Sequence, residues 1–156
     1  MWYTETMKIY LGSDHNGFLL KERVFAYLVK YGYDVEDVGG RELNPDDDFP
    51  QFAQAAALRV IGDASEDPRA ILICGGGQGM SMAANRFKGG RASGIWDAAE
   101  ARPARNDNGS NVLCLPGRIL EHDEAAWKGI LETWLNTPYA NAPRYNRRNA
   151  QLDELA

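Results

Sequence analysis

The chain has few cysteines and histidines, no long hydrophobic run and no excess of positive charge. Its two cysteines, Cys74 and Cys114, are too few for the disulfide framework of a small secreted protein. Both lie at the ends of short apolar runs, which is typical of reduced thiols, so we expect a cytoplasmic protein. Because the only histidines are His15 and His122, a structural zinc site is not expected and no metal is assigned.

These absences also bear on partners and targeting. The formal net charge is −5 at pH 7, so nucleic acid is not the expected partner. No apolar run approaches the length of a membrane span, and no membrane partner is expected. Residues 1–6 lack the basic and apolar regions of a signal peptide and are interpreted as a short extension before a first strand. A length of 156 residues suits one domain with its own hydrophobic core.

Short strand-like runs alternate with longer helical patterns along the chain, with no internal repeat. Strands are predicted over 8–12, 33–38, 70–74, 91–95 and 111–115. Helices are predicted over 18–31, with Leu19, Val24, Tyr27 and Leu28 at helical spacing, and over 49–61, 78–87, 98–105, 123–135 and the basic tail. The polar loop at 39–48 is unusually acidic at Asp46-Asp47-Asp48. This alternation predicts an α/β fold with a parallel sheet covered on both faces, and a ligand site at the carboxyl ends of its strands.

The most informative stretch is the glycine-rich segment that begins at Cys74. Four of the next five residues are glycine, namely Gly75, Gly76, Gly77 and Gly79, and a helical pattern follows. Glycines let backbone N–H groups converge on one point and a helix start adds positive potential, so the loop suits an anion. A thiolate is favoured there, and Cys74 is interpreted either as a general base or nucleophile or as a small buried apolar residue. Cys114 is followed by no such loop and is expected to pack in the core.

Two nucleotide-binding motifs are similar to this loop without matching it. The glycines depart from G-x-G-x-x-G at Met80, although Asp97 lies about where that motif places an acid. The loop also follows the third predicted strand rather than the first, and the lysine and hydroxyl pair of a P-loop is absent. A nucleotide-binding oxidoreductase is kept as an alternative, which NAD or flavin binding would identify.

Polar and basic residues at other element ends are further candidates. Asp14 and His15 follow the first predicted strand directly, which favours a role in the site. The segment 106–111 suits either an ordinary turn or the binding of sugar hydroxyls. Simple topology brings it in from the opposite edge of the sheet, and whether a helix or a neighbouring subunit carries it to the site stays open. Arg144 and Arg148 share a face of a helix, which suits either phosphate binding or a solvated surface.

Taken together, these motifs resemble the type B ribose-5-phosphate isomerase and galactose-6-phosphate isomerase family. The resemblance covers residues 7–152 and rests on Gly12-Ser13-Asp14-His15-Asn16-Gly17-Phe18 with Lys21, Asp48-Phe49-Pro50, Cys74-Gly75 through Ala83-Ala84-Asn85, Asn108 with Asn111-Val112-Leu113, Gly117-Arg118, and Arg144 with Arg148. It implies a Rossmann-like three-layer fold with a five-stranded parallel sheet, in one domain over 1–156. It also implies no metal or redox cofactor, and sites at the interface of a homodimer or a dimer of dimers. The C-terminal arm, 137–156, would cross to the partner subunit, and Trp127, Trp134 and Tyr139 suit either that interface or ordinary core packing.

The resemblance further implies an aldose–ketose isomerase of phosphorylated sugars, with ribose 5-phosphate and ribulose 5-phosphate as the default pair. Cys74 would move a proton between C1 and C2 through a cis-enediol, and the amides of Gly75 to Gly79 would stabilise the enediolate oxygens. Asp14 and Asn108 would hold substrate oxygens. The phosphate would be bound by His15, Arg118, Arg144 and Arg148.

The chain departs from the family's pattern at three positions. Gly76 stands where ribose-type members carry Thr or Ser, so a hydroxyl donor is missing. Asp107 stands where they carry the histidine credited with opening the furanose ring, and a carboxylate could still act there as acid and base. Tyr145 replaces a further histidine near the phosphate site. Two alternatives therefore stay open: an isomerase of another sugar phosphate, such as a tetrose or hexose, and a non-catalytic sugar-phosphate-binding protein.

Overall fold

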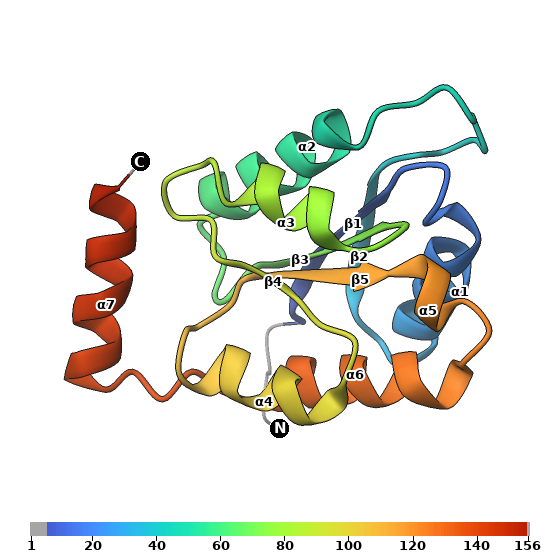
Figure 1. The fold of residues 1–156 in the computed structure, drawn as a ribbon. Coiled ribbons are helices and arrows are strands. Elements are labelled where there is room, and N and C mark those ends of the chain that lie inside the picture. Colours follow the sequence, from blue (N-terminus) through green and yellow to red (C-terminus); the bar gives the residue numbers. More distant parts are fainter. Residues whose placement is uncertain (1–5, 156) are drawn as a thin grey trace.

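A computed structural model describes residues 6–155 as a three-layer α/β structure (Figure 1). The parallel sheet has the order β2-β1-β3-β5-β4 and consists of β1 (Lys8–Ser13), β2 (Asp34–Gly39), β3 (Arg69–Cys74), β4 (Ala92–Gly94) and β5 (Val112–Pro116). The helices are α1 (Phe18–Lys30), α2 (Phe49–Gly62), α3 (Gln78–Ala84), α4 (Ala98–Asn106), α5 (Gly117–Leu120), α6 (Glu124–Asn136) and α7 (Pro143–Glu154). The expected fold class and five-stranded parallel sheet are confirmed. The extension expected over residues 1–6 lies, apart from Thr6, outside the described residues.

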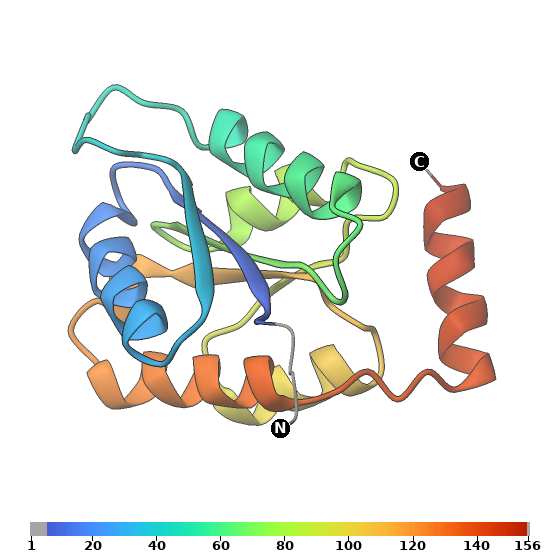
Figure 2. The ribbon, with the colours of Figure 1, turned by 180° about the vertical axis from the view of Figure 1, so that it is seen from behind.

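Helices cover both faces of the sheet, as a parallel sheet requires. Every residue of β3 is buried, and its side chains alternate between the two faces. Ala70, Leu72 and Cys74 pack with α2 and α3, whereas Ile71 and Ile73 pack with α1, α4 and α6. The two helical layers lie on opposite sides of the sheet in both views (Figures 1 and 2). None of the helices in the described range is both long and apolar enough to cross a bilayer.

The centre of the sheet is the point where the chain changes direction. Strand β1 pairs with β2 on one side and with β3 on the other, so the connections that follow β1 and β3 diverge, which is where open α/β sheets bind ligands. The loop after β1 lies directly against the end of β3, since the Asp14 N–H donates to the Ile73 carbonyl at 3.3 Å. Gly17 is equally close, because a Cβ there would lie 2.2 Å from the Ile73 oxygen.

The turn after β2 is fixed by a buried lysine of α1. The Nζ of Lys21 donates to the carboxylate of Asp37 at 2.6 Å and to the carbonyl of Gly40 at 2.6 Å. Gly40 has a φ of +62°, and a Cβ there would lie 2.3 Å from the carbonyl oxygen of Ser13. The first residues of the β2–α2 loop (residues 40–48) are therefore held against the end of β1.

Two of the expected helix details are wrong. Leu19 does not belong to the apolar face of α1: it is 51% exposed, and the helix packs through Leu20, Val24 and Leu28 instead. Helix α3 ends at Ala84 rather than at residue 87. The side chain of Asn85 forms two hydrogen bonds with the backbone of Ala92, donating to its carbonyl and accepting its N–H, and these bonds turn the chain toward β4.

One further helix differs from expectation, whereas the packing of three core residues agrees with it. The four-residue helix α5 was not expected, since a single turn carries no periodic pattern. Trp127 and Trp134 are buried in the cluster beneath α4 and α6, which confirms the core interpretation for both. Cys114 is fully buried, as expected.

The close approach at Gly17 gives a first prediction. We expect Gly17→Ala to lower the free energy of unfolding by about 2–3 kcal/mol, because the added methyl group must displace the end of β3. Urea unfolding monitored by tryptophan fluorescence measures the change. Gly62→Ala is the matched control, since a Cβ at Gly62 meets nothing within 4 Å and should alter stability by less than about 1 kcal/mol. Equal effects of the two substitutions would contradict the packing argument.

Candidate active site

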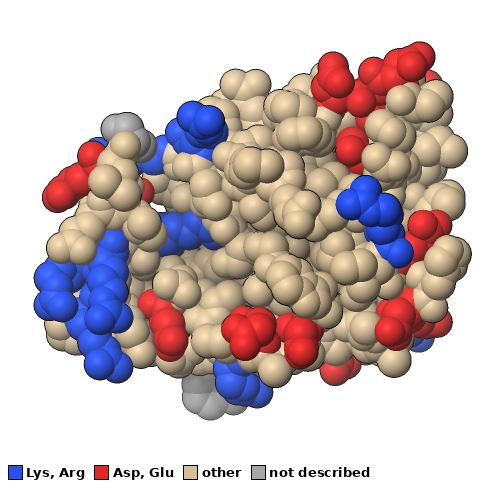
Figure 3. Space-filling model, viewed as in Figure 1, with Lys and Arg blue, Asp and Glu red and all other residues tan. Residues whose placement is uncertain are grey.

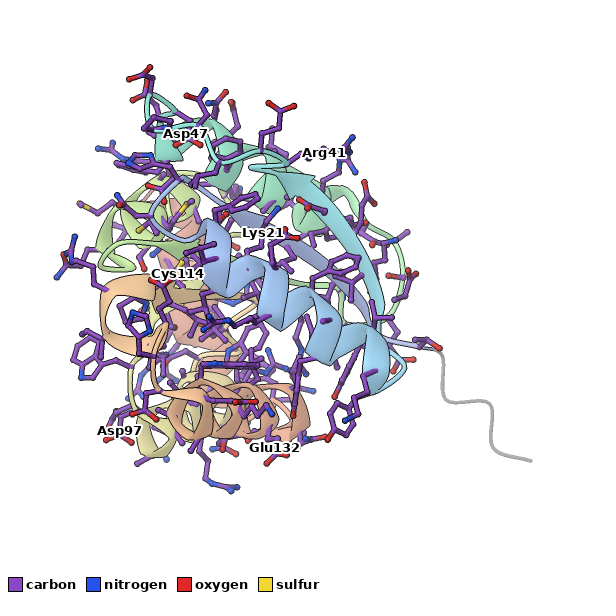
Figure 4. The ribbon with its side chains drawn as sticks, turned by 90° about the vertical axis from the view of Figure 1, so that its right-hand side faces the viewer. Lys21, Arg41, Asp47, Asp97, Cys114 and Glu132 are labelled. Carbon is purple, nitrogen blue, oxygen red and sulfur yellow. The ribbon has the colours of Figure 1, made fainter. Side chains whose placement is uncertain are left out.

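Three loops converge at the carboxyl edge of the sheet. Figure 4 looks onto this edge, with Asp47 labelled near the top and Asp97 near the bottom. The three are the loop after β1, with Asp14 and His15, the glycine loop after Cys74, and the start of α5 after β5, with Arg118. Because the carboxyl ends of parallel strands share one edge, the topology alone brings these candidates together.

Cys74 is the last residue of β3 and pairs with Pro116 of β5. Its thiol is free, and the residue is 5% exposed within the cluster that packs against α2 and α3. Cys74 therefore has the burial of a core residue together with a position at the ligand-binding edge. Burial alone does not separate the two interpretations offered by the sequence.

The glycine loop is packed against Arg118. The backbone N–H of Arg118 donates to the Gly75 carbonyl at 3.0 Å. A Cβ at Gly75 would lie 2.6 Å from Nη1 of Arg118, and one at Gly76 would lie 3.1 Å from Nη2. The guanidinium thus occupies the space beside the loop where a larger residue at position 75 or 76 would lie. It makes no hydrogen bond or ion pair with the described residues, which leaves its charge available to an anionic ligand.

The loop leads into α3 through Gly77, whose φ of +74° favours glycine. Ser81 donates its hydroxyl hydrogen to the Gly77 carbonyl at 2.8 Å, which ties the loop to the first turn of the helix. At Gly79 a Cβ would lie 2.8 Å from the ring of Phe49 on α2, so this position also requires glycine. The loop therefore has a defined conformation, held by close contacts with Arg118, Phe49 and the first turn of α3.

Asp14 lies buried beneath this edge. Its Oδ1 accepts the backbone N–H groups of Asn16 at 3.0 Å and Gly17 at 3.1 Å. Burial raises the pKa of the Asp14 carboxyl, although these hydrogen bonds and the charge of His15 act in the opposite direction. Asp14 is thus an acceptor that also fixes the turn leading into α1.

His15 is paired with a residue that the sequence patterns did not single out. The Oδ1 of Asp47 lies 2.7 Å from Nδ1 of His15 and accepts its backbone N–H at 3.0 Å. This hydrogen bond is the main reason that the pKa of His15 is raised, and partial burial acts against it. The acidic run at 46–48 was the available signal, but it did not indicate which aspartate turns inward.

Asp14, His15 and Asp47 are also the described group that most resembles a metal site. One ligand atom from each lies within 4.8 Å of the others. Oxygens of both carboxylates are engaged with backbone N–H groups, and Asp47 is also engaged with the imidazole. We assign no metal to this group.

Asp97 also lies at this edge, where a dinucleotide-binding interpretation would use its carboxylate. That carboxylate instead accepts the Ala99 N–H at 2.8 Å and caps α4. The residue therefore has a structural function that needs no nucleotide.

The remaining candidates lie at the opposite, amino edge of the sheet. Asp107 follows the last turn of α4, and its carboxylate accepts the side-chain N–H of Asn106 at 2.8 Å. The carbonyl of Asn108 accepts the Nδ2–H of Asn149 on α7 at 3.1 Å. Figure 1 shows α7 beyond the edge that faces away from α5. The segment 106–111 thus enters from the opposite edge, as topology suggested, and does not reach Cys74 within its own chain.

Helix α7 carries the basic residues expected to bind phosphate. None of its residues is buried, and its arginines form a blue group at the left of Figure 3. The guanidinium of Arg144 stacks on Tyr145, with 5.1 Å between Cζ and the ring centroid, and Arg148 is exposed. Tyr139 lies at the base of the arm, where its hydroxyl bonds Asn146 at 2.8 Å. One chain therefore carries two separate clusters of candidates, one at each edge of the sheet.

Comparison with known proteins places this arrangement among sugar isomerases. Residues 9–152 match the Ribose/Galactose Isomerase family. The ribose-5-phosphate isomerase B of Mycolicibacterium paratuberculosis is 37% identical over 150 residues, which cover 96% of this chain and 90% of that protein. The 4-deoxy-4-sulfo-D-erythrose isomerase of a Clostridium species is 40% identical over 138 residues, or 85% of this chain and 81% of that protein. The crystal structure of ribose-5-phosphate isomerase B from Mycoplasma genitalium with bound ribulose-5-phosphate has a TM-score of 0.88 and 31% identity, and covers 96% of this chain and 95% of that one.

Proposed function

The chain belongs to the ribose/galactose isomerase family, and on that premise we propose that it interconverts an aldose phosphate and the corresponding ketose phosphate. Ribose 5-phosphate and ribulose 5-phosphate are the leading pair, since they are the compounds of its relatives named above. The observation that carries the proposal is the position of Cys74, at the end of the central strand β3 and beside a glycine loop covered by Arg118.

The reaction requires a base and a set of hydrogen-bond donors at adjacent positions. The Cys74 thiolate removes the proton from C2 of the open-chain aldose, and the electrons of the C–H bond form the C1–C2 double bond of an enediolate. The proton of the C2 hydroxyl passes to O1, and the same thiol returns a proton to C1, so that C2 becomes the carbonyl carbon of the ketose. Backbone N–H groups of Gly75 to Gly79 stabilise the enediolate oxygens.

No redox cofactor is needed, because C1 is reduced as C2 is oxidised within one molecule. Asp14 and Asn108 hold substrate oxygens. Asp107 is the acid and base that opens the ring of a cyclic sugar. The anionic end of the substrate is bound by His15, Arg118, Arg144 and Arg148. Both cysteines are free thiols, and we place the enzyme in the cytoplasm, where thiols stay reduced.

The site is proposed to be shared between two copies of the chain. Cys74 lies at one edge of the sheet, whereas Asn108 and the arginines of α7 lie at the other. A second copy related by two-fold symmetry can add its amino-edge cluster to the carboxyl-edge cluster of the first, which creates two equal sites. The arm at 137–156 crosses to the partner in this arrangement, and the absence of buried residues in α7 supports it. A homodimer and a dimer of such dimers satisfy the requirement equally.

A four-carbon substrate is the second candidate. The relative that acts on 4-deoxy-4-sulfo-D-erythrose is 40% identical to this chain. An erythrose with an anionic group at C4 has no free C4 hydroxyl with which to close a furanose ring. Such a substrate needs no ring opening, which fits an aspartate rather than a histidine at position 107. A hexose phosphate is supported only by the galactose in the name of the matching family.

Solvent proton exchange tests the mechanism and the substrate together. We expect deuterium from D₂O to enter C1 or C2 of ribose 5-phosphate or D-erythrose 4-phosphate, as followed by NMR. Cys74→Ala should slow this exchange by about 10²–10⁴-fold, the usual contribution of a positioned acid–base group. Cys114→Ala is the matched control, because it removes the other buried thiol, which lies within β5 rather than at the carboxyl end of its strand.

Two outcomes would contradict the proposal. Exchange that persists in Cys74→Ala would exclude that thiol as the base. Binding of a sugar phosphate by the wild-type protein, with no exchange into any compound tested, would identify a non-catalytic sugar-phosphate-binding protein.

Mixing two inactive variants tests the shared site. Cys74→Ala and Arg148→Ala each damage a different edge of the sheet, so about half of randomly formed dimers are mixed and each mixed dimer has one intact site. We expect co-refolded protein to recover about a quarter of the wild-type rate. Cys74→Ala mixed with Asp14→Ala is the control, because both changes affect the same edge and no intact site forms. A site confined to one chain would give no recovery in either mixture.

A further inference from the structure

One aspartate of the acidic β2–α2 loop reaches the candidate site. Only 5% of the Asp47 side chain is exposed, although its neighbours Asp46 and Asp48 lie on the surface. Its Oδ1 bonds both the backbone N–H and the Nδ1 of His15, at 3.0 Å and 2.7 Å. Figure 4, which looks onto the carboxyl edge of the sheet, shows Asp47 near the top of that edge. A single oxygen thus fixes the main chain and the ring of His15 together.

The position of Asp47 is built into the surrounding structure. The Asp47 N–H donates to the Asn44 carbonyl at 3.2 Å, and the Asn44 side chain accepts the Asp46 N–H at 3.0 Å, so the loop forms a tight turn just before Asp47. At the start of the loop, Lys21 holds the carbonyl of Gly40. The loop is therefore anchored at its first residue and again in the turn just before Asp47.

We propose that Asp47 is a positioning residue, which fixes the ring orientation and tautomer of His15 so that Nδ1–H faces Asp47 and Nε2 faces the anionic group of the substrate. The proposal rests on the function proposed above. Nε2 has no hydrogen-bond partner within residues 6–155, and 29% of the His15 side chain is exposed, so this nitrogen is accessible to a ligand. Because the Asp47 carboxylate can only accept a hydrogen bond, Nδ1 of His15 must carry a proton. Nε2 is then unprotonated in the neutral ring, and it donates a hydrogen bond only when the ring takes up a second proton.

The charges around His15 favour that second proton. Asp14 faces the ring from its own loop, and Asp46 and Asp47 face it from the β2–α2 loop. All three carboxylates raise the pKa of His15, and the hydrogen bond to Asp47 contributes most. The Nε2–H donor is therefore fully present below the ordinary pKa of histidine and is lost only as the pH rises through the raised value.

The titration of His15 tests the role of Asp47 directly. The chain has two histidines, so a His122→Gln background leaves one imidazole to follow by ¹H and ¹⁵N NMR. Asp47→Asn keeps the size and the acceptor oxygen but removes the charge. We expect it to lower the pKa of His15 toward the ordinary value. Asp46→Asn is the matched control, since it removes a nearby charge that makes no hydrogen bond to the ring, and its effect should be smaller.

Kinetics give the second measurement. For ribose 5-phosphate and D-erythrose 4-phosphate, the alkaline fall of kcat/KM should move to lower pH in Asp47→Asn. KM at pH 8 should rise about three- to tenfold, as expected when a charge-assisted hydrogen bond to the substrate is weakened. Asp47→Glu keeps the charge, and it should restore the alkaline limb in part.

Failure of this proposal and failure of the proposed function are distinguishable. A His15 titration that changes no more in Asp47→Asn than in Asp46→Asn would overturn the proposal, and so would an unchanged pH profile of kcat/KM in Asp47→Asn. A wild-type protein that exchanges no proton with any sugar phosphate would contradict the proposed function instead, and the NMR titration does not depend on that result.

Discussion

The pairing of β1 with β3 at the centre of a parallel sheet is the constraint on which the carboxyl edge depends. The chain leaves these two strands in opposite directions, and ligands bind at such a point in open α/β sheets. Residues 14–17 are held against the end of β3. Cys74, the glycine loop and His15 lie together there because each ends or follows one of the two central strands. Arg118 completes the edge because β5 is the next strand across the sheet.

The same parallel topology separates the second group of candidates. Each crossover helix carries the chain back to the amino ends of the strands, and α4 therefore ends with Asp107 at the edge opposite Cys74. No rotation of side chains within one subunit spans the sheet. The shared site proposed above follows from this connectivity, and it accounts for a basic helix at the end of the chain of which no residue is buried in its own subunit. A two-fold symmetric dimer is the simplest assembly that brings the carboxyl-edge residues of one copy to the amino-edge residues of the other.

Much of this architecture could be predicted from local patterns, and the errors come from contacts that local patterns do not contain. The apolar runs of β1, β3 and β5 identify central strands, and the glycines after Cys74 identify a loop that lies close to its neighbours. Leu19 and Leu20 are adjacent and equally apolar, so only packing against the sheet distinguishes them. The end of α3 is decided by bonds from Asn85 to Ala92 across a turn. Asp47 is one of three consecutive aspartates, and its contact with a residue 32 positions away depends on the whole β1–α1–β2 unit.

The exposed helix α7 has a further consequence for the concentration at which this protein works. It contains 12 residues, and isolated helices of that length are marginal in water. Few hydrogen bonds attach it to its own subunit. Among them, the Asp153 carboxylate accepts the Gly89 N–H, and the Asn149 side chain donates to the Asn108 carbonyl. In the proposed dimer the partner supplies the missing burial, so ordering of the arm and association of subunits form a single equilibrium. Specific activity then follows mass action, and dilution below the dissociation constant removes both sites of a dimer in one step.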